Sequence, residues 1–210
     1  IKKSVKEYKF MNTIKVSIDS QKYQLKPSGD DIRYISSRIA RSVRSVNPDE
    51  LKKVVSQIGN DGCTFSPATF KNGKRSRDNF EQQQLFVLDF DNKDPGNRIT
   101  FDEVKERADH YELPILSAYD TLSSMQHDKF RVVFLNDVSV SDRRVAEAVQ
   151  LAIGRMFPEA DPSCYKDVSK LYFGGKGLLY YDENLPKVNI ESIFRNYTYF
   201  MRKRYKDNHY

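Results

Sequence analysis

The sequence predicts a protein of the α/β or α+β class that is built on one main sheet. Segments with the period of a strand alternate with segments that have the period of a helix, and no repeat or low-complexity segment interrupts them. The 210 residues are 39% hydrophobic and 30% charged, which is typical of a globular chain. We expect a single domain over residues 1–210, with an N-terminal αβ elaboration at 1–62, a core at 63–185 and a basic C-terminal helix at 186–210.

Composition and cysteine content exclude several other classes. No stretch approaches the roughly 18 uninterrupted apolar residues that cross a bilayer, so we expect no membrane partner. The sequence starts with Ile1-Lys2-Lys3-Ser4, which is not typical of a signal peptide and is compatible with a piece of a longer protein. Cys63 and Cys164 lie far apart and only three histidines are present, so we expect no disulfide framework, no structural zinc site and a reducing cytoplasm.

The first elements are a strand or hairpin and two helices. Apolar and polar residues alternate over 13–25, and Pro27-Ser28-Gly29 ends that pattern. Asp30 or Asp31 then caps a helix, whose apolar face is formed by Ile32, Ile35, Ile39 and Val43. Pro48 opens a second helix that ends at Asp61-Gly62, with the apolar residues Leu51, Val54, Val55 and Ile58.

The middle of the chain predicts the strands of the main sheet. The polar stretch 63–84 is expected to be a long loop with a short hairpin. Residues 85–91 form a near-continuous apolar run that ends in acids, which indicates a buried central strand. Thr100 or Asp102 caps a helix that runs to about His110. Further strands are expected at 114–119 and 130–135, joined by a polar turn over 120–129.

Two helices and a short strand complete the predicted order. Ser141 caps a helix with the apolar residues Val145, Ala148, Val149, Ala152, Ile153 and Met156. A short strand is expected at 171–173, directly before Gly174-Gly175, and a basic helix from Ile190 onward.

The formal net charge of +6 is unevenly distributed. One acid-free stretch of seven residues holds four cations, at Lys71, Lys74, Arg75 and Arg77. A second cluster alternates with aromatic residues near the C-terminus and comprises Arg195, Arg202, Lys203, Arg204 and Lys206. Such clusters suit phosphate backbones, so the first one is a candidate DNA-binding segment. A solvated surface is the other interpretation of either cluster.

The sharpest chemical feature is the pair of carboxylates at the end of the strand 85–91. Because strand side chains alternate between faces, Asp89 and Asp91 emerge on the same side, and Phe90 packs on the other. Two carboxylates this close repel each other, and a divalent cation removes that repulsion. Oxygen ligands suit Mg²⁺ or Mn²⁺. The alternative is a strand end that runs into an acidic turn.

Two further segments carry polar groups that suit phosphate. Ser123, Ser124 and His127 lie in a turn that leads to Arg131, a candidate bidentate phosphate ligand on a strand. Buried strands rarely carry arginine without a charged partner. Asp161 offers a third carboxylate, and Lys170 follows nine positions later. An ordinary surface turn is the other interpretation of this last segment, and Gly174-Gly175 is not followed by the pattern of a phosphate-binding P-loop.

These three segments together resemble the archaeo-eukaryotic primase superfamily, the primase-polymerases of phages, plasmids and other mobile elements. Val87-Leu88-Asp89-Phe90-Asp91 is similar to the first motif of that family, and Ala160-Asp161 with Lys170 is similar to the third. The resemblance covers roughly residues 60 to 180. In the second motif the family places a histidine on the strand, whereas here His127 precedes the strand and Arg131 occupies it. Either residue can fill that role, and Asp167 is an alternative to Asp161.

The resemblance implies a central mixed sheet and a catalytic core over 63–185 that transfers nucleotides onto a primer. It implies two Mg²⁺ or Mn²⁺ ions held by Asp89, Asp91 and Asp161. It implies that nucleoside triphosphate is bound by Ser123, Ser124, His127, Arg131 and Lys170, and single-stranded DNA template by Lys71, Lys74, Arg75 and Arg77. A helicase in the same chain or in trans is a further partner that the family implies.

Two other functions remain open at this stage. The first is a phosphatase whose nucleophile lies in a strand-end Asp-x-Asp, although Lys93 stands where that chemistry favours threonine or valine. The second is a non-catalytic module that binds single-stranded DNA during replication, which needs the basic clusters but not three carboxylates.

Overall fold

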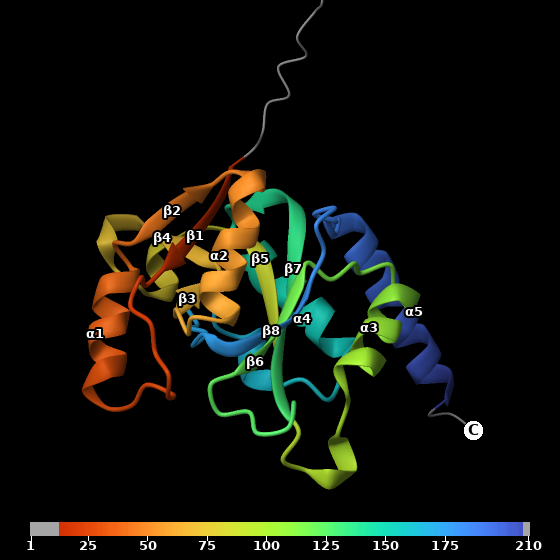
Figure 1. Cartoon of the computed structure of the whole chain (residues 1–210). Helices are drawn as coiled ribbons and strands as arrows, with labels where there is room; N and C mark the ends of the chain where they lie inside the picture. Colours follow the sequence, from red (N-terminus) through yellow and green to blue (C-terminus); the bar gives the residue numbers. More distant parts are fainter. Residues whose placement is uncertain (1–12, 208–210) are drawn as a thin grey trace, which may run out of the picture.

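The computed structural model describes residues 13–207, so the expectations for Ile1–Ser4 lie outside the described residues (Figure 1). Two antiparallel sheets and five α-helices make up this part of the chain, which confirms the α+β class. The smaller sheet has the order β2-β1-β3 and consists of β1 (Ile14–Ile18), β2 (Val43–Val46) and β3 (Phe65–Ser66). No helix among residues 13–207 combines the length and the apolar character that crossing a bilayer requires.

The larger sheet has the order β4-β5-β7-β6-β8. Its strands are β4 (Ala68–Phe70), β5 (Phe80–Asp91), β6 (Ser117–Thr121), β7 (Lys129–Val140) and β8 (Gly175–Tyr181). Every strand pair in this sheet is antiparallel, where we expected a mixed sheet. The long partners β5 and β7 run in opposite directions because the chain returns from one to the other through α3 and the short strand β6.

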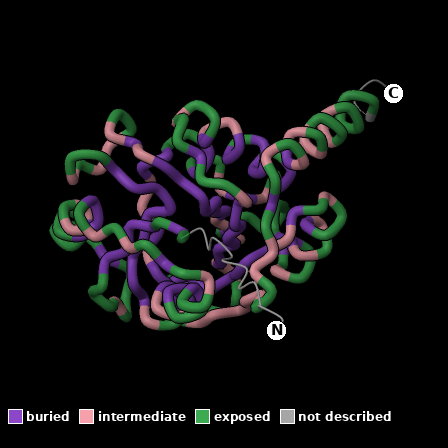
Figure 2. The backbone as a smooth tube through the Cα atoms, turned by 90° about the horizontal axis from the view of Figure 1, so that it is seen from above, coloured by how far each residue is buried: buried purple, intermediate pink, exposed green. Residues whose placement is uncertain are grey.

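Helices cover both faces of the larger sheet (Figure 1). α2 (Leu51–Gly59) packs on β6 and β8, and α4 (Arg143–Arg155) packs on β5 and β7. The remaining helices are α1 (Asp30–Ile39), α3 (Phe101–His110) and α5 (Ile190–Asp207). Figure 2 shows the C-terminal half of α5 reaching beyond the body of the molecule, where its basic residues are exposed.

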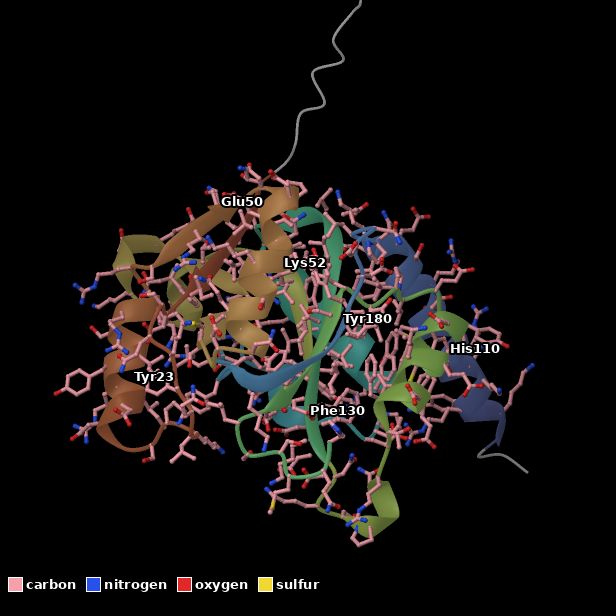
Figure 3. The ribbon with its side chains drawn as sticks, in the orientation of Figure 1. Tyr23, Glu50, Lys52, His110, Phe130 and Tyr180 are labelled. Carbon is pink, nitrogen blue, oxygen red and sulfur yellow. The ribbon has the colours of Figure 1, made fainter. Side chains whose placement is uncertain are left out.

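The register of the sheet separates an aromatic face from a charged face. Residues directly opposite each other on antiparallel strands share a face, and Phe90 lies opposite Phe130. These two rings stack with centroids 4.9 Å apart and are fully buried, with Phe157 edge-on to Phe90. Phe130 lies in the middle of the molecule in Figure 3. Asp89 lies opposite Arg131 and therefore points to the other face.

One predicted helix cap is confirmed, and two others were wrong. The hydroxyl of Thr100 accepts a hydrogen bond from the backbone N–H of Glu103, and the carboxylate of Glu103 accepts one from the backbone N–H of Thr100. Thr100 and not Asp102 therefore caps α3. The cap of α4 is Asp142 and not Ser141, because its carboxylate accepts the backbone N–H of Arg144. The two expected N-terminal helices are confirmed, but neither Asp30 nor Asp31 caps α1; that position is Gly29.

Three expectations about strands were wrong. Val43 belongs to β2 and not to the apolar face of α1, which ends at Ile39. The strand predicted at 171–173 is a single bridge between Tyr172 and Phe65. The edge strand β8 follows it and was missed, because its glycines hide the strand pattern. Gly175 needs to be glycine, since a Cβ there would lie 2.3 Å from the carbonyl oxygen of Asp120.

Candidate active site

A cavity of about 270 Å³ opens on the charged face, where the ends of β5 and β7 meet two loops. It combines three carboxylates with four cationic side chains. The carboxylates are Asp89, Asp91 and Asp161, and the cations are Lys26, Lys93, Lys129 and Arg131. Thr121, Leu122, Ser123 and Phe173 complete the lining. A cavity with this composition suits a polyanion together with divalent cations.

Arg131 is the buried centre of the charged face. Its side chain donates a 3.0 Å hydrogen bond to Oδ2 of Asp89 and another to the carbonyl oxygen of Phe173. The guanidinium also lies over the rings of Tyr172 and Tyr119, at 5.6 and 6.0 Å from their centroids. Burial opposes the charge of Arg131, but the neighbouring Asp89 and Tyr119 outweigh it and raise the pKa of this guanidinium. With only 9% of the residue exposed, Arg131 mainly fixes the position of the Asp89 carboxylate.

Asp161 lies directly beside Asp89 because its chain segment pairs with the end of β5. The backbone N–H of Asp161 donates a 2.8 Å hydrogen bond to the carbonyl oxygen of Asp89, and Ala160 forms a bridge with Phe90. The hydroxyl of Tyr165 holds this turn through the carbonyl oxygens of Ala160 and Gly154, at 3.1 and 3.0 Å.

The carboxylate of Asp161 is held by two donors of Ser163. Its backbone N–H lies 2.8 Å and its hydroxyl 2.6 Å from the oxygens of Asp161, and Nζ of Lys170 lies 3.7 Å away. Burial favours the neutral acid, but these hydrogen bonds outweigh it, so the pKa of Asp161 is lowered. The third carboxylate of the cavity is therefore ionised at neutral pH.

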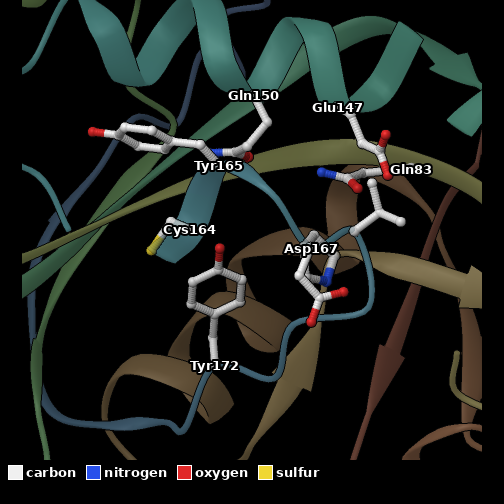
Figure 4. Close-up of a pocket in the computed structure, with 9 residues that line it drawn as sticks. Gln83, Glu147, Gln150, Cys164, Tyr165, Asp167 and Tyr172 are labelled. Carbon is white, nitrogen blue, oxygen red and sulfur yellow. The ribbon is translucent and has the colours of Figure 1, made fainter. Parts of the chain in front are cut away.

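Asp167, the alternative to Asp161, points elsewhere. It lines a small cavity of about 10 Å³ next to β5, together with Gln83 and Glu147 (Figure 4). Its carboxylate accepts the backbone N–H and the hydroxyl of Ser169, at 2.8 and 2.6 Å. The structure thus brings Asp161, and not Asp167, to the two carboxylates of β5.

The thiol of Cys164 lies close to two of these carboxylates. Ligand atoms of Asp89, Asp161 and Cys164 all lie within 4.8 Å of one another, the one such group of acidic, cysteine or histidine side chains found in residues 13–207. Cys164 is 1% exposed, burial raises the pKa of its thiol, and Nζ of Lys170 lies 3.1 Å from its sulfur. Asp91 stays outside this group, because Lys93 at 2.7 Å and Lys129 at 3.5 Å hold its carboxylate.

The donor set fits a divalent cation. Asp89 and Asp161 supply carboxylate oxygens close to one another, and Asp91, which lines the same cavity, carries a further carboxylate that is paired with the exposed Lys93. Carboxylates that leave positions open for other ligands are typical of Mg²⁺ and Mn²⁺ sites. The buried thiol was not anticipated as part of this group, since only the fold brings it there.

The residues of the expected second motif separate into two sets. Ser123 and Arg131 line the cavity. Ser124 is buried, and its hydroxyl donates to the carboxylates of Asp120 and Asp128, so it stabilises the turn. The ring of His127 lies 2.6 Å from Asp120 through Nδ1, and its side chain is 74% exposed on a different cleft. The strand position of the motif is therefore the one that reaches the carboxylates.

In the predicted DNA-binding segment 71–77, two of the four cations are already bound to other residues of the protein. Arg77 forms a two-point ion pair with Glu147, at 2.6 and 2.8 Å, and Arg75 donates to Ser36 and to the carbonyl oxygen of Ser169. Lys71 and Lys74 are exposed.

Three cations of the cavity were missed from the sequence. Lys93 and Lys129 flank motifs that were recognised, so their position next to Asp91 could have been inferred from the strand pattern. Lys26 carries no such signal, because it lies in the loop between β1 and α1. That loop is anchored by Arg38, which donates to Asp19 at 2.7 Å and to Tyr23 at 3.0 Å, and by the burial of Pro27.

Fold and cavity together define an α+β protein with a cavity that is lined by three carboxylates and four cationic side chains. No protein-family profile matches the chain, and no curated protein matches it. Among solved structures it is similar to the AEP domain of the primase-polymerase (PrimPol) of cyanophage S-2L, with a TM-score of 0.46 and 8% sequence identity. The match covers 73% of this chain and 78% of that one. It is a distant similarity of overall fold and assigns no role to any residue.

Proposed function

We propose that the protein is a nucleotidyltransferase of the primase-polymerase type, which adds nucleotides to a primer on a single-stranded DNA template. The observation that carries this proposal is the meeting of Asp89, Asp91 and Asp161 at one cavity whose remaining charged lining is cationic. Ion-binding carboxylates next to cations that face a polyphosphate are what such a reaction needs. A binding module needs no such carboxylate cluster.

Each side chain has a distinct task in this proposal. Asp89 and Asp161, with Asp91, hold Mg²⁺ or Mn²⁺, which supplies the Lewis acidity that activates the primer hydroxyl and stabilises the leaving pyrophosphate. Arg131 positions Asp89 through their 3.0 Å hydrogen bond. With a divalent cation held at Asp91, Lys93 and Lys129 would be available to bind phosphates, and the hydroxyl of Ser123 would bind a phosphate or sugar oxygen.

The other residues of the expected triphosphate site act at its border in this proposal. Lys170 lies 3.7 Å from Asp161 and can turn toward a bound phosphate. Ser124 and His127 share the acceptor Asp120 and shape the turn that presents Ser123.

The direct test is an incorporation assay with the purified protein, a primed single-stranded template and each of the eight nucleotides labelled separately. We expect incorporation that requires Mg²⁺ or Mn²⁺ and stops when the metal is chelated. The same preparation is tested for hydrolysis of a simple phosphomonoester. Hydrolysis without incorporation would identify a phosphatase, and metal-independent DNA binding without either activity would identify a binding module.

Lys26 provides a second prediction at the same site. Lys93, Lys129 and Arg131 are each paired with a carboxylate, whereas the Lys26 ammonium has no hydrogen bond or ion pair within residues 13–207. It is therefore the cation most ready to bind phosphate. We expect Lys26→Met to raise the KM for nucleotide by up to about fivefold with little change in kcat, the range of an exposed charge contact.

Two controls make the Lys26 result specific. Lys26→Arg keeps the charge and should restore the KM. Lys15→Met removes an exposed lysine of β1 that does not line the cavity and should leave the KM unchanged. A Lys26→Met enzyme with the nucleotide KM of the unmodified protein contradicts a phosphate contact at this position.

A further inference from the structure

A second recess lies away from the carboxylates, between α1 and the turn that follows β4. It has a volume of about 530 Å³. Four of its lining side chains are cationic and none is acidic: Arg33, Arg41, Lys74 and Arg75. Ser36 and Ser37 add hydroxyl groups between them. A concave surface with this composition attracts a chain of phosphates.

The periodicity of α1 explains the alignment on its side. Arg33 and Ser37 are spaced by four residues and lie on one face of α1, while Ile35 and Ile39 face the core. Arg41 follows two residues after the end of α1 and lines the same recess. Both arginines line this one recess, so they can contact phosphates of the same strand, and Arg33 also forms an exposed ion pair with Asp30 at 3.0 Å. Nη2 of Arg41 donates to Ser37 at 3.1 Å and makes no ion pair within residues 13–207.

The opposite wall is a tight turn in which two consecutive residues adopt the left-handed backbone region. Asn72 and Gly73 both have positive φ, at 58° and 60°. A Cβ on Gly73 would lie 3.1 Å from Cγ of Arg41. The turn therefore lies directly against the stem of Arg41, and it presents Lys74, which has no hydrogen bond or ion pair from its ammonium in the described part of the chain.

Arg75 forms the floor of the recess and ties it to the active site. Its Nε donates to Ser36 at 3.0 Å, and its Nη1 donates to the carbonyl oxygen of Ser169. Ser169 directly precedes Lys170, whose ammonium lies next to Asp161. The side chain of Arg75 is thus held in place by α1 and by the segment that carries one edge of the candidate active site.

An exposed tyrosine next to the recess favours single-stranded over duplex DNA as the ligand. Tyr34 is 63% exposed and lies on α1 three residues before Ser37, which lines the recess. Aromatic rings beside a basic groove stack on the unpaired bases of a single strand. Duplex DNA keeps its bases stacked inside, and it is bound by elements that enter its grooves.

We propose that the recess between α1 and the 71–75 turn binds the phosphate backbone of single-stranded DNA, with Tyr34 stacking on a base. This inference rests on the proposed function for the role of the strand as template, but its binding chemistry is independent of the active site. It extends the predicted DNA-binding segment to α1, whose residue pattern carries no indication of such a role.

The test measures affinity for a fluorescein-labelled oligo(dT) by anisotropy at several salt concentrations, without metal or nucleotide. We expect Arg41→Gln combined with Lys74→Gln to weaken binding at least about tenfold. The slope of log Kd against log salt should fall by about 1.4, since each phosphate contact to a single strand contributes about 0.7. Tyr34→Ala should weaken binding with an unchanged slope.

A matched double variant controls for net charge. Lys53→Gln with Arg155→Gln removes one lysine and one arginine that are exposed elsewhere, and it should bind as the unmodified protein does. Arg41 and Lys74 are exposed, so the fold is not at risk. Unchanged affinity for oligo(dT) in the Arg41/Lys74 variant overturns the proposal. An equal loss of affinity for a duplex of the same length overturns the preference for single-stranded DNA.

The outcomes also separate this inference from the proposed function. If the protein shows no incorporation activity but loses DNA affinity on Arg41→Gln with Lys74→Gln, the recess binds DNA and the proposed polymerase function is wrong. If the protein incorporates nucleotides but the DNA affinity of that variant is unchanged, the polymerase function stands and the recess does not bind the template.

Discussion

Asp89→Asn is expected to reduce metal-dependent nucleotide incorporation by about a hundredfold or more. Asparagine has the same shape as aspartate but lacks the charge that holds a divalent cation. Asp89 is also the residue through which Arg131 and Asp161 meet: its side chain accepts from Arg131 and its carbonyl oxygen accepts from Asp161. Asp89 is thus the residue of the cavity that contacts both Arg131 and Asp161. The measurement is the incorporation rate at saturating nucleotide with Mg²⁺ and with Mn²⁺.

Asp49→Asn is the control for this variant. Asp49 is exposed in the turn before α2, and it does not line the cavity, so the loss of one surface carboxylate there should not alter the rate. Thermal unfolding of both variants shows whether the fold is intact. Full incorporation by a folded Asp89→Asn protein would refute the metal site.

Arg131→Met is expected to have the largest effect on stability. The substitution removes the partner of Asp89 and leaves a largely buried carboxylate without its counter-charge. Breaking such a buried pair costs about 3–5 kcal/mol of the free energy of unfolding. For a chain of this size that corresponds to a fall in Tm of about 6–20 °C. Urea unfolding followed by circular dichroism measures the change.

A comparison of variants identifies the ion pair as the cause. Arg131→Met with Asp89→Asn removes both charges and should recover part of the lost stability, because no unpaired charge remains. Arg144→Met breaks an ion pair of similar length, 2.9 Å, that is exposed, and it should change stability little. If Arg131→Met unfolds at the same urea concentration as the unmodified protein, the buried pair contributes nothing to the fold.

Local patterns in the sequence were enough for most of the helices and for the central strands. The apolar run at 85–91 lies within β5, and its two-residue period places Asp89 on the other face of the sheet from the stacked ring of Phe90. The capping box of Thr100 is a contact between neighbours in the sequence and was therefore readable. β8 was not, because its strand character comes from pairing with β6 and not from its own glycine-containing sequence.

The site was predicted in part. The three carboxylates were named, and so was Arg131, on the ground that a buried arginine needs a charged partner. The choice of Asp161 over Asp167 required the hydrogen bond between Asp161 and Asp89, which joins residues more than seventy positions apart. Cys164 and Lys26 reach the carboxylates only through such long-range packing.

The chain's own order of residues determined the α+β class, the face on which the carboxylates of β5 emerge and the presence of two basic clusters, because periodicity and capping act over a few residues. Tertiary structure alone decided that Asp161 and not Asp167 lies beside Asp89, that Arg131 is bound to Asp89, and that α1 and the 71–75 turn form one basic recess. Those outcomes depend on how the loops pack against the sheet, and a loop's packing partner is not written in its own pattern of residues.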